Sequence, residues 1–183
     1  MTAMMKLRLI GAAALALLAT APAHAADKRM VTYDSVSPDA RRLTGAGLTF
    51  VFTKRMMRTR ILAVHATAVP VGVVVRPSGD GGLNRKLGAL MGDEARSGDL
   101  YEIDPAEQQG AVMVQAFCPG STRGWLAIGG IGHRPLRVHA FGNDPATGEP
   151  RLCAAMDFAF RGEWRMPREN SSDPTKDVFA PNY

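Results

Sequence analysis

"LCAAMDFAF", residues 152–160, alternates two kinds of side chain at every second position. One set is apolar and mostly large: Leu152, Ala154, Met156, Phe158 and Phe160. The other set is small apart from one carboxylate: Cys153, Ala155, Asp157 and Ala159. Because successive side chains of a strand point to opposite faces, this period of two predicts a strand with one core-facing row. The small row leaves room for a helix to approach the other face closely.

Other stretches with strand character precede this one. They share β-branched or alternating apolar residues and cover 30–33, 48–52, 61–75, 100–103, 125–128 and 136–141. Pro70 and Gly72 interrupt the longest of them, which predicts a bend, a bulge or an edge position there. Turn-rich links, "GGIGHRP" at 129–135 and "GNDPATGEP" at 142–150, separate the last strands of the chain.

Two short helices are predicted from local signals. Ser37 can cap a helix that starts at Pro38 and ends before Gly45, so we predict a helix over 38–44. A glycine-rich loop then precedes apolar residues at helical spacing, which predict a helix through about residue 91: Leu83, Leu87 and Leu90. Gly79, Gly81 and Gly82 lack the spacing of a phosphate-binding loop, so we interpret them as a plain loop with Asp80 as the helix cap.

A third helix is predicted over about 105–117. Its start has an aspartate before a first-turn proline and an acid close behind: Asp104, Pro105 and Glu107. The stretch "AVMVQAF", 111–117, also fits a buried strand, so both assignments stay open. Either element ends at Cys118, because a proline and a glycine follow.

These elements together predict an α+β domain. We expect an antiparallel sheet of about five to seven strands, able to curl, with about two or three short helices, one of them packed on a sheet face. The helix that ends at Cys118 is expected to lie on the small-residue face around Cys153. The face with the larger side chains must be covered as well, and a curl of the sheet into a half-barrel is one way to do so.

The first 25 residues have the three parts of an export signal. Lys6 and Arg8 provide positive charge, Leu9 to Ala23 form an apolar stretch, and Ala23-His24-Ala25 is an A-x-A cleavage site. The apolar stretch falls short of the ~20 residues that a membrane-spanning helix needs. We therefore predict cleavage between Ala25 and Ala26, a periplasmic or secreted product, and no transmembrane segment in the mature chain.

The domain organisation follows from this cleavage. Residues 1–25 are the predicted signal peptide, 26–164 a single globular domain, and 165–183 a flexible C-terminal tail, because the tail is polar, carries prolines and has no hydrophobic period. The formal net charge is +5, to which the leader contributes two positive charges. This mild basicity does not identify a partner by itself.

Cys118 and Cys153 are the two cysteines of the chain. In an exported domain such a pair predicts an intramolecular disulfide bond. An alternative is a nucleophilic Cys118 with His133 or His139 as its base, as in a thiol-dependent enzyme. Metal binding is not expected, because neither the cysteines nor the histidines have ligand spacing, and no cofactor motif is present.

The segment "TKRMMRTR", 53–60, joins two predicted strands and is rich in cations: Lys54, Arg55, Arg58 and Arg60. A solvated hairpin tip is the simpler interpretation, because runs of charge usually face water. A contact for an anionic component of the cell envelope is the functional one. No pattern for specific nucleic-acid recognition is present.

No catalytic residues are assigned from the sequence. A Ser-His-Asp set can be assembled only from scattered positions, Ser121, His139 and Asp144, without a G-x-S-x-G motif. His65 falls on a predicted strand face, where a structural histidine is more common than a catalytic one. Asp157 interrupts an apolar strand, and if it is buried it needs a partner such as Arg123 or Arg161.

The leading functional interpretation is an exported, non-enzymatic binding or envelope-associated module with one disulfide. The alternative is a small periplasmic hydrolase or thiol-dependent enzyme that uses Cys118 with His133 or His139. A structural subunit of an envelope assembly is a third interpretation, which an exposed apolar patch would favour.

Overall fold

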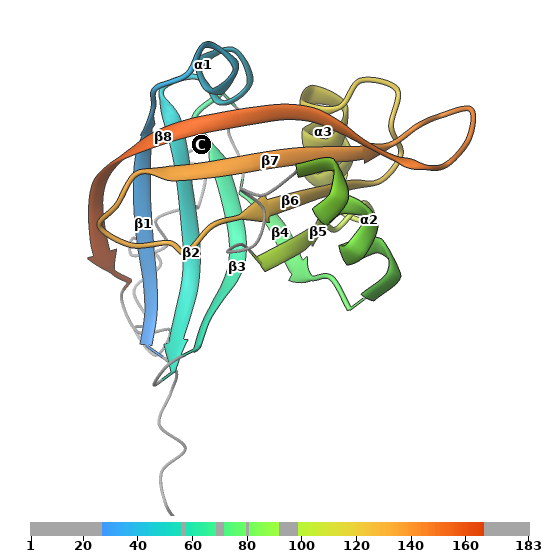
Figure 1. The fold of residues 1–183 in the computed structure, drawn as a ribbon. Helices are drawn as coiled ribbons and strands as arrows, with labels where there is room; N and C mark the ends of the chain where they lie inside the picture. Colours follow the sequence, from blue (N-terminus) through green and yellow to red (C-terminus); the bar gives the residue numbers. More distant parts are fainter. Residues whose placement is uncertain (1–26, 56–57, 69–71, 80, 92–98, 167–183) are drawn as a thin grey trace, which may run out of the picture.

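Eight antiparallel strands close into a barrel in the order in which they occur in the chain (Figure 1). The computed structural model describes residues 27–55, 58–68, 72–79, 81–91 and 99–166. The strands are β1 Asp27–Ser35, β2 Gly47–Arg55, β3 Arg58–Ala66, β4 Val73–Pro77, β5 Asp99–Ile103, β6 Gly124–Ile128, β7 Leu136–Asn143 and β8 Pro150–Arg165. The helices are α1 Pro38–Thr44, α2 Gly81–Met91 and α3 Gln108–Phe117.

The expected α+β sheet of about five to seven strands is therefore wrong, because the sheet has eight strands and closes on itself. The predicted run 61–75 contributes to two strands, β3 and β4. The predicted first and last strands also prove to be neighbours, and their pairing completes the ring.

The last strand closes the barrel because it pairs with two neighbouring strands, β7 and β1. Residues 150–158 of β8 pair with β7, and residues 158–165 pair with β1. The register slips once in each ladder, which leaves Cys153 and Arg161 as the extra residues of two bulges. A bulge bends a strand and increases its twist. Figure 1 shows the result: β8 runs across β1, β2 and β3 and then turns down beside β1.

Alternate residues of the strands fill the barrel interior. Tyr33, Phe50 and Phe158 are among the largest side chains that are fully buried there. The bulge at Cys153 reverses the alternation of β8, so Leu152 leaves the core row expected for it and is 41% exposed. The interior is thus packed with side chains, as in other small barrels.

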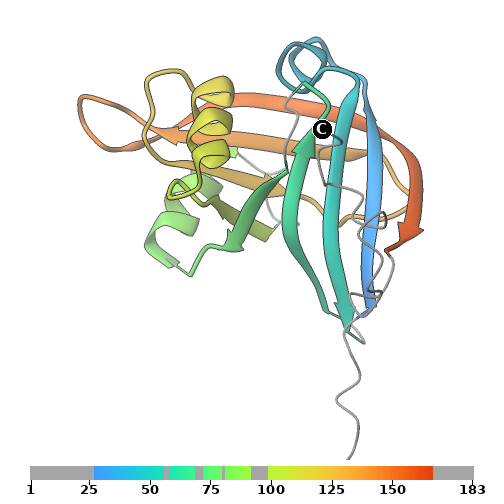
Figure 2. The ribbon, with the colours of Figure 1, turned by 180° about the vertical axis from the view of Figure 1, so that it is seen from behind.

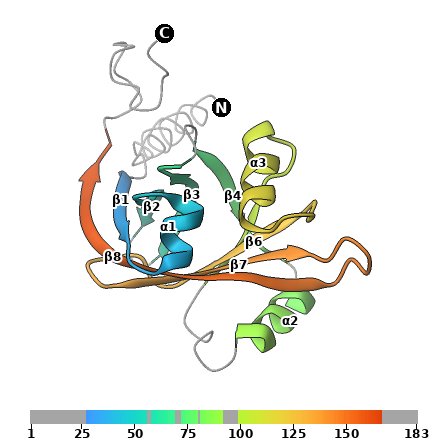
Figure 3. The same ribbon diagram turned by 90° about the horizontal axis from the view of Figure 1, so that it is seen from above.

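Helices α1 and α3 lie at one end of the barrel, and α2 lies on its outer surface. Viewed from above, α1 sits over the space enclosed by the strands, whereas α2 lies on the far side of β7 and β8 (Figure 3). Figure 2 shows α3 from behind, next to β4. Phe117 of α3 belongs to the interior cluster, and Leu87 of α2 packs with Trp125 and Phe141 outside it. The helix on the small-residue face of β8 is therefore α2, not the one ending at Cys118.

The first helix forms as predicted. The Ser37 hydroxyl accepts a hydrogen bond from the Ala40 amide at 3.2 Å, Pro38 occupies the first turn, and Gly45 follows with a φ of 70°. The same hydroxyl accepts the amide of Asp157 at 3.0 Å, which attaches the start of α1 to β8. The cap thus stabilises the helix and fixes its position.

The predicted signal peptide, with Ala25 and Ala26 at its cleavage site, lies outside the described residues. Of the predicted tail 165–183, residues 167–183 lie outside them as well, and Arg165 is the last residue of β8. In the part of the chain that the structure describes, no helix is long and apolar enough to cross a membrane.

Candidate functional site

The barrel end opposite α1 and α3 is the candidate site, and we call it the mouth. The β2–β3 hairpin, the loop 129–135 between β6 and β7, the start of β1 and the end of β8 meet there. In the order of the chain these elements are far apart. Closure of the barrel is what brings them together.

The mouth gathers the cations predicted on the hairpin and adds two more. Arg55, the last residue of β2, and Arg58, the first residue of β3, are register partners, and Lys54 and Arg60 are exposed beside them. Strand pairing adds cations from β1 and β8, and we call the whole set the mouth cations: Lys28, Lys54, Arg55, Arg58, Arg60 and Arg165. No local sequence signal marks Lys28 and Arg165, because they reach the hairpin only through pairing of distant strands.

The loop 129–135 lies across the mouth and is fastened to β1. The Tyr33 hydroxyl donates to the Gly132 carbonyl at 2.8 Å and accepts from the Gly132 amide at 2.7 Å. Ile131 of the same loop packs against the interior cluster. Burial raises the pKa of the Tyr33 hydroxyl above its ordinary value, so the hydroxyl stays protonated and able to donate.

Beneath this loop is an inward-facing ion pair. Glu163 is a register partner of Val31, whose side chain is buried in the core, so both lie on the inner face. Arg29 donates to the Glu163 carboxylate at 2.9 Å, and the two side chains are 25% and 19% exposed. His133 lies 3.6 Å from the other carboxylate oxygen and packs its ring over Phe160, with 4.7 Å between the centroids. The partly buried carboxylate is thus compensated by charge.

A small pocket opens where β3 and β4 separate. These strands pair only at Ala63 with Val74 and Val64 with Val73. Beyond that point the amide of Ile61 donates to the Tyr101 hydroxyl of β5 at 3.4 Å. The pocket has a volume of about 130 Å³ and is lined by Thr59, Ile61, Asp99, Tyr101, Ile128, Gly129, Gly130 and Ile131.

This pocket is too small for a drug-sized ligand. Typical ligand pockets measure roughly 300–1,000 Å³, and a water molecule takes roughly 30 Å³ of the liquid. The Tyr101 hydroxyl on its wall has a pKa raised by burial. The pocket therefore suits a few water molecules or one small polar group.

The cysteines lie at the opposite end of the barrel, where they form the predicted disulfide bond. Cys118 follows the last residue of α3, Cys153 is the bulge residue of β8, and their Cα atoms are 5.4 Å apart. Cys118 is 1% exposed. The free thiolate that the enzyme interpretation needs is therefore not present in this structure.

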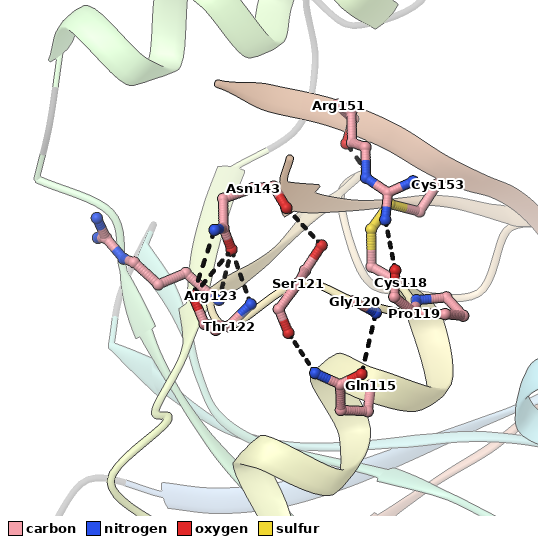
Figure 4. The surroundings of a disulfide bond; sticks show 10 residues. All are labelled: Gln115, Cys118, Pro119, Gly120, Ser121, Thr122, Arg123, Asn143, Arg151 and Cys153. Atoms are coloured by element: carbon pink, nitrogen blue, oxygen red, sulfur yellow. Dashed lines mark hydrogen bonds between the residues drawn. A yellow bond between two sulfur atoms is a disulfide. The ribbon is translucent and has the colours of Figure 1, made fainter. Parts of the chain in front are cut away.

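Hydrogen bonds around the disulfide hold the turn after α3 (Figure 4). The Asn143 side chain accepts the amides of Thr122 and Arg123 at 2.9 and 2.7 Å. Gln115 accepts the Gly120 amide at 3.0 Å, and Arg151 donates to the carbonyl of Pro119 at 2.6 Å. Each of these bonds satisfies a turn backbone group, so we interpret this region as structural.

Asp157, the acid singled out in the sequence, has a different partner from those expected. Asp157 accepts from Arg137 at 2.6 Å, and the two side chains are 43% and 46% exposed. The expected partners bind elsewhere: Arg123 pairs with Glu102 at 2.6 Å, and Arg161 with Asp34 at 3.4 Å. The Asp157 pair is thus a half-exposed cross-strand contact of the kind that contributes little to stability.

The imagined Ser-His-Asp set does not form a catalytic arrangement. The hydroxyl of Ser121 donates to the carbonyl of Asn143 at 2.7 Å, and Asp144 accepts the amides of Ala146 and Thr147, both at 2.9 Å. The ring of His139 lies beside that of Phe141, with 6.4 Å between the centroids.

Within the described ranges, no cluster of three or more histidine, cysteine or acidic side chains has the arrangement of a metal site. No protein-family model, no curated protein and no solved structure matches this chain.

Proposed function

We propose that the protein is an exported, non-enzymatic binding module of the cell envelope, and that it binds an anionic partner through the mouth cations. The observation that carries the proposal is the register of β1, β2 and β3. Lys28 pairs with Thr53, and Thr53 pairs with Arg60, so cations of β1 and β3 lie on either side of Thr53 in one row across the sheet. A concentration of one sign of charge attracts partners of the other sign.

The local balance of charge supports an anionic partner. Two acids of the described mouth are Glu163, with which Arg29 already pairs at 2.9 Å, and Asp99, which lines the pocket. Lys54 and Arg60 are exposed on the hairpin. The exposed cations of the described mouth, Lys54, Arg60 and Arg165, therefore outnumber its exposed acid, Asp99.

Several features favour binding over catalysis. The barrel interior is filled, the pocket at the mouth has a volume of only about 130 Å³, and Cys118 is held in a disulfide bond. An enzyme for a small molecule needs a cleft that encloses its substrate. A binding module for an extended anionic surface needs only the exposed cations.

The cell compartment is proposed from the sequence. Residues 1–25 have the pattern of an export signal. A disulfide bond between residues 35 positions apart persists in oxidising compartments such as the periplasm. Detection of the mature chain in a periplasmic extract, with its N-terminus at Ala26, tests this part of the proposal.

Charge reversal at the mouth tests the binding. The double variant Lys54→Glu/Arg60→Glu is compared with Arg41→Glu/Arg42→Glu, which makes the same change of net charge on α1 at the opposite end. Arg41 and Arg42 are both exposed. Binding is measured to vesicles of phosphatidylglycerol in phosphatidylcholine and to a sulfated polysaccharide, at several salt concentrations.

We expect the mouth variant to lose at least tenfold in affinity and the α1 variant to lose less than threefold. Binding of the unmodified protein should weaken as salt rises. Equal losses in both variants would show that only net charge matters, and no loss in either would remove the mouth from the proposal.

A further inference from the structure

An exposed tryptophan lies beside the mouth cations. Trp164, near the end of β8, is 47% exposed, and its register partner on β1 is Met30. Figure 2 shows the end of β8 alongside β1. A Cβ atom at Gly162 would touch the indole ring, so the ring lies against its own strand. The absence of a side chain at Gly162 is what permits this position.

The outer face of β8, β1, β2 and β3 is ordered in rows by the strand register. The row of the tryptophan is apolar and comprises Trp164, Met30, Val51 and Ala63; Trp164 is its exposed member, whereas Val51 is only 5% exposed. The next row toward the mouth is polar and cationic: Lys28, Thr53 and Arg60. Both rows lie outside the barrel, because the residue between them on β2, Phe52, is buried in the interior. The rows are separated by about 7 Å, the rise of two strand residues.

An exposed tryptophan on the same face as exposed cations is a combination that suits the surface of a lipid bilayer. Anionic headgroups attract lysine and arginine at the membrane surface, and tryptophan prefers the headgroup level, where an apolar ring and a polar N–H are both accommodated. A dissolved anion would engage the cations alone and would not explain the neighbouring tryptophan.

We propose that this face docks the protein on an anionic lipid bilayer, with Trp164 at headgroup level and the exposed Arg60 on the lipid phosphates. The proposal rests on the proposed function and names the partner of the same mouth cations. Each cation that meets an anionic headgroup strengthens binding about fivefold, so the face binds weakly to neutral lipid and strongly to an anionic surface.

Trp164 is a built-in reporter for the test. The chain has two tryptophans, and the other, Trp125, is 3% exposed under α2. Vesicles of phosphatidylcholine with increasing phosphatidylglycerol are added to the full protein, and tryptophan emission and its quenching by acrylamide are recorded. We expect a shift of the emission to shorter wavelength and protection from acrylamide with phosphatidylglycerol only, reversed by high salt.

Two variants separate docking from a loss of fold. Trp164→Ser removes the proposed contact, and Val112→Ser removes a side chain on α3 that is 49% exposed at the opposite end. We expect Trp164→Ser to weaken binding to anionic vesicles at least tenfold, to abolish the emission shift and to leave binding to a soluble sulfated polysaccharide within twofold. Val112→Ser should bind vesicles within twofold of the unmodified protein.

The outcomes distinguish this inference from the proposed function. Vesicle binding with unchanged emission overturns docking through Trp164 and leaves anion binding by the mouth intact. Binding to polysaccharide but not to vesicles overturns the lipid partner, and a loss with Trp164→Ser then assigns the ring to sugar stacking. Absence of binding to both anions overturns both proposals.

Discussion

Tyr33 and Gly132, which are 99 residues apart in the sequence, share two hydrogen bonds of 2.8 and 2.7 Å through one hydroxyl group. The tyrosine ring is fully buried, with Phe50 and Phe160 edge-on to it at centroid distances of 5.9 and 6.0 Å. A rigid side chain of β1 thereby fixes the loop that crosses the mouth. The position of the loop 129–135 across the mouth depends on this contact.

Tyr33→Phe is expected to lower the free energy of unfolding by about 1–3 kcal/mol, because two backbone groups of Gly132 lose their partner while the ring packing stays. Urea denaturation measures the change. Amide exchange at Gly132 should accelerate in the variant. Unchanged exchange there would contradict the role of the hydroxyl as the fastening of the loop.

Alkaline pH should destabilise the fold through Tyr33 and Tyr101. Burial raises the pKa of both hydroxyls in the folded state. A raised pKa contributes stability that is complete below the unfolded value of about 10 and is lost as pH rises through the folded value. Unfolding and tyrosinate absorbance should therefore rise together above about pH 10. Ionisation of both groups without any loss of stability would contradict this coupling.

Loss of the disulfide is expected to cost up to about 4 kcal/mol of the free energy of unfolding, because the bond closes a loop between cysteines 35 positions apart. Cys118→Ala/Cys153→Ala and chemical reduction should give similar losses in urea denaturation. A thiol count on the native and the denatured protein should find no free thiol. A fast-reacting Cys118 would instead favour the alternative interpretation, a thiol-dependent enzyme that uses Cys118 with His133 or His139.

Gly142→Ala should disturb the turn after α3. A Cβ atom at this position would collide with the sulfur of Cys118 and the hydroxyl of Ser121. Neither group can retreat, because one is in the disulfide bond and the other donates to Asn143 at 2.7 Å. We expect a loss of about 1–3 kcal/mol by thermal denaturation.

Gly130→Ala is the matched control for that substitution. A Cβ atom at Gly130 has no neighbour within 4 Å. We expect the change in stability to stay within about 0.5 kcal/mol. Equal effects of the two substitutions would show that the contact with Cys118 is not the cause.

Acid should loosen the turn between β7 and β8. The amides of Thr147 and Ala146 lower the pKa of the Asp144 carboxyl. A lowered pKa contributes stability that is present above the unfolded value of about 3.9 and is lost as pH falls through the folded value. An NMR titration of the carboxyl carbon should give a midpoint below about 3.9, and Asp144→Ala should abolish protection of the Thr147 amide.

Local signals predicted the first helix well. Ser37, Pro38 and Gly45 act within a few residues of one another, and the helix spans Pro38–Thr44 as expected. The positions of the hairpin cations were likewise predictable, because the period of the flanking strands is local. Sequence reasoning works where the physical cause lies within one element.

Closure of the barrel could not be predicted, because it depends on contacts between distant residues. The ion pair of Arg29 and Glu163 spans 134 positions. Of the bulges that bend β8 toward β1, the one at Cys153 has no turn residue to mark it, and the one at Arg161 is marked by Gly162 alone. For the same reason the sequence did not predict that Lys28 and Trp164 lie on one face, because that placement depends on pairing of distant strands.

The two ladders of β8 also set the order of folding events. Every other pair of neighbouring strands is consecutive in the chain and can form as the chain emerges, whereas the ring can close only when β8 is complete. Cys153 belongs to the same strand, so its disulfide bond with Cys118 can form only after β8 has been synthesised. Until residues 150–165 arrive, β1 and β7 each present an unpaired edge, and the nascent domain depends on rapid completion to escape aggregation.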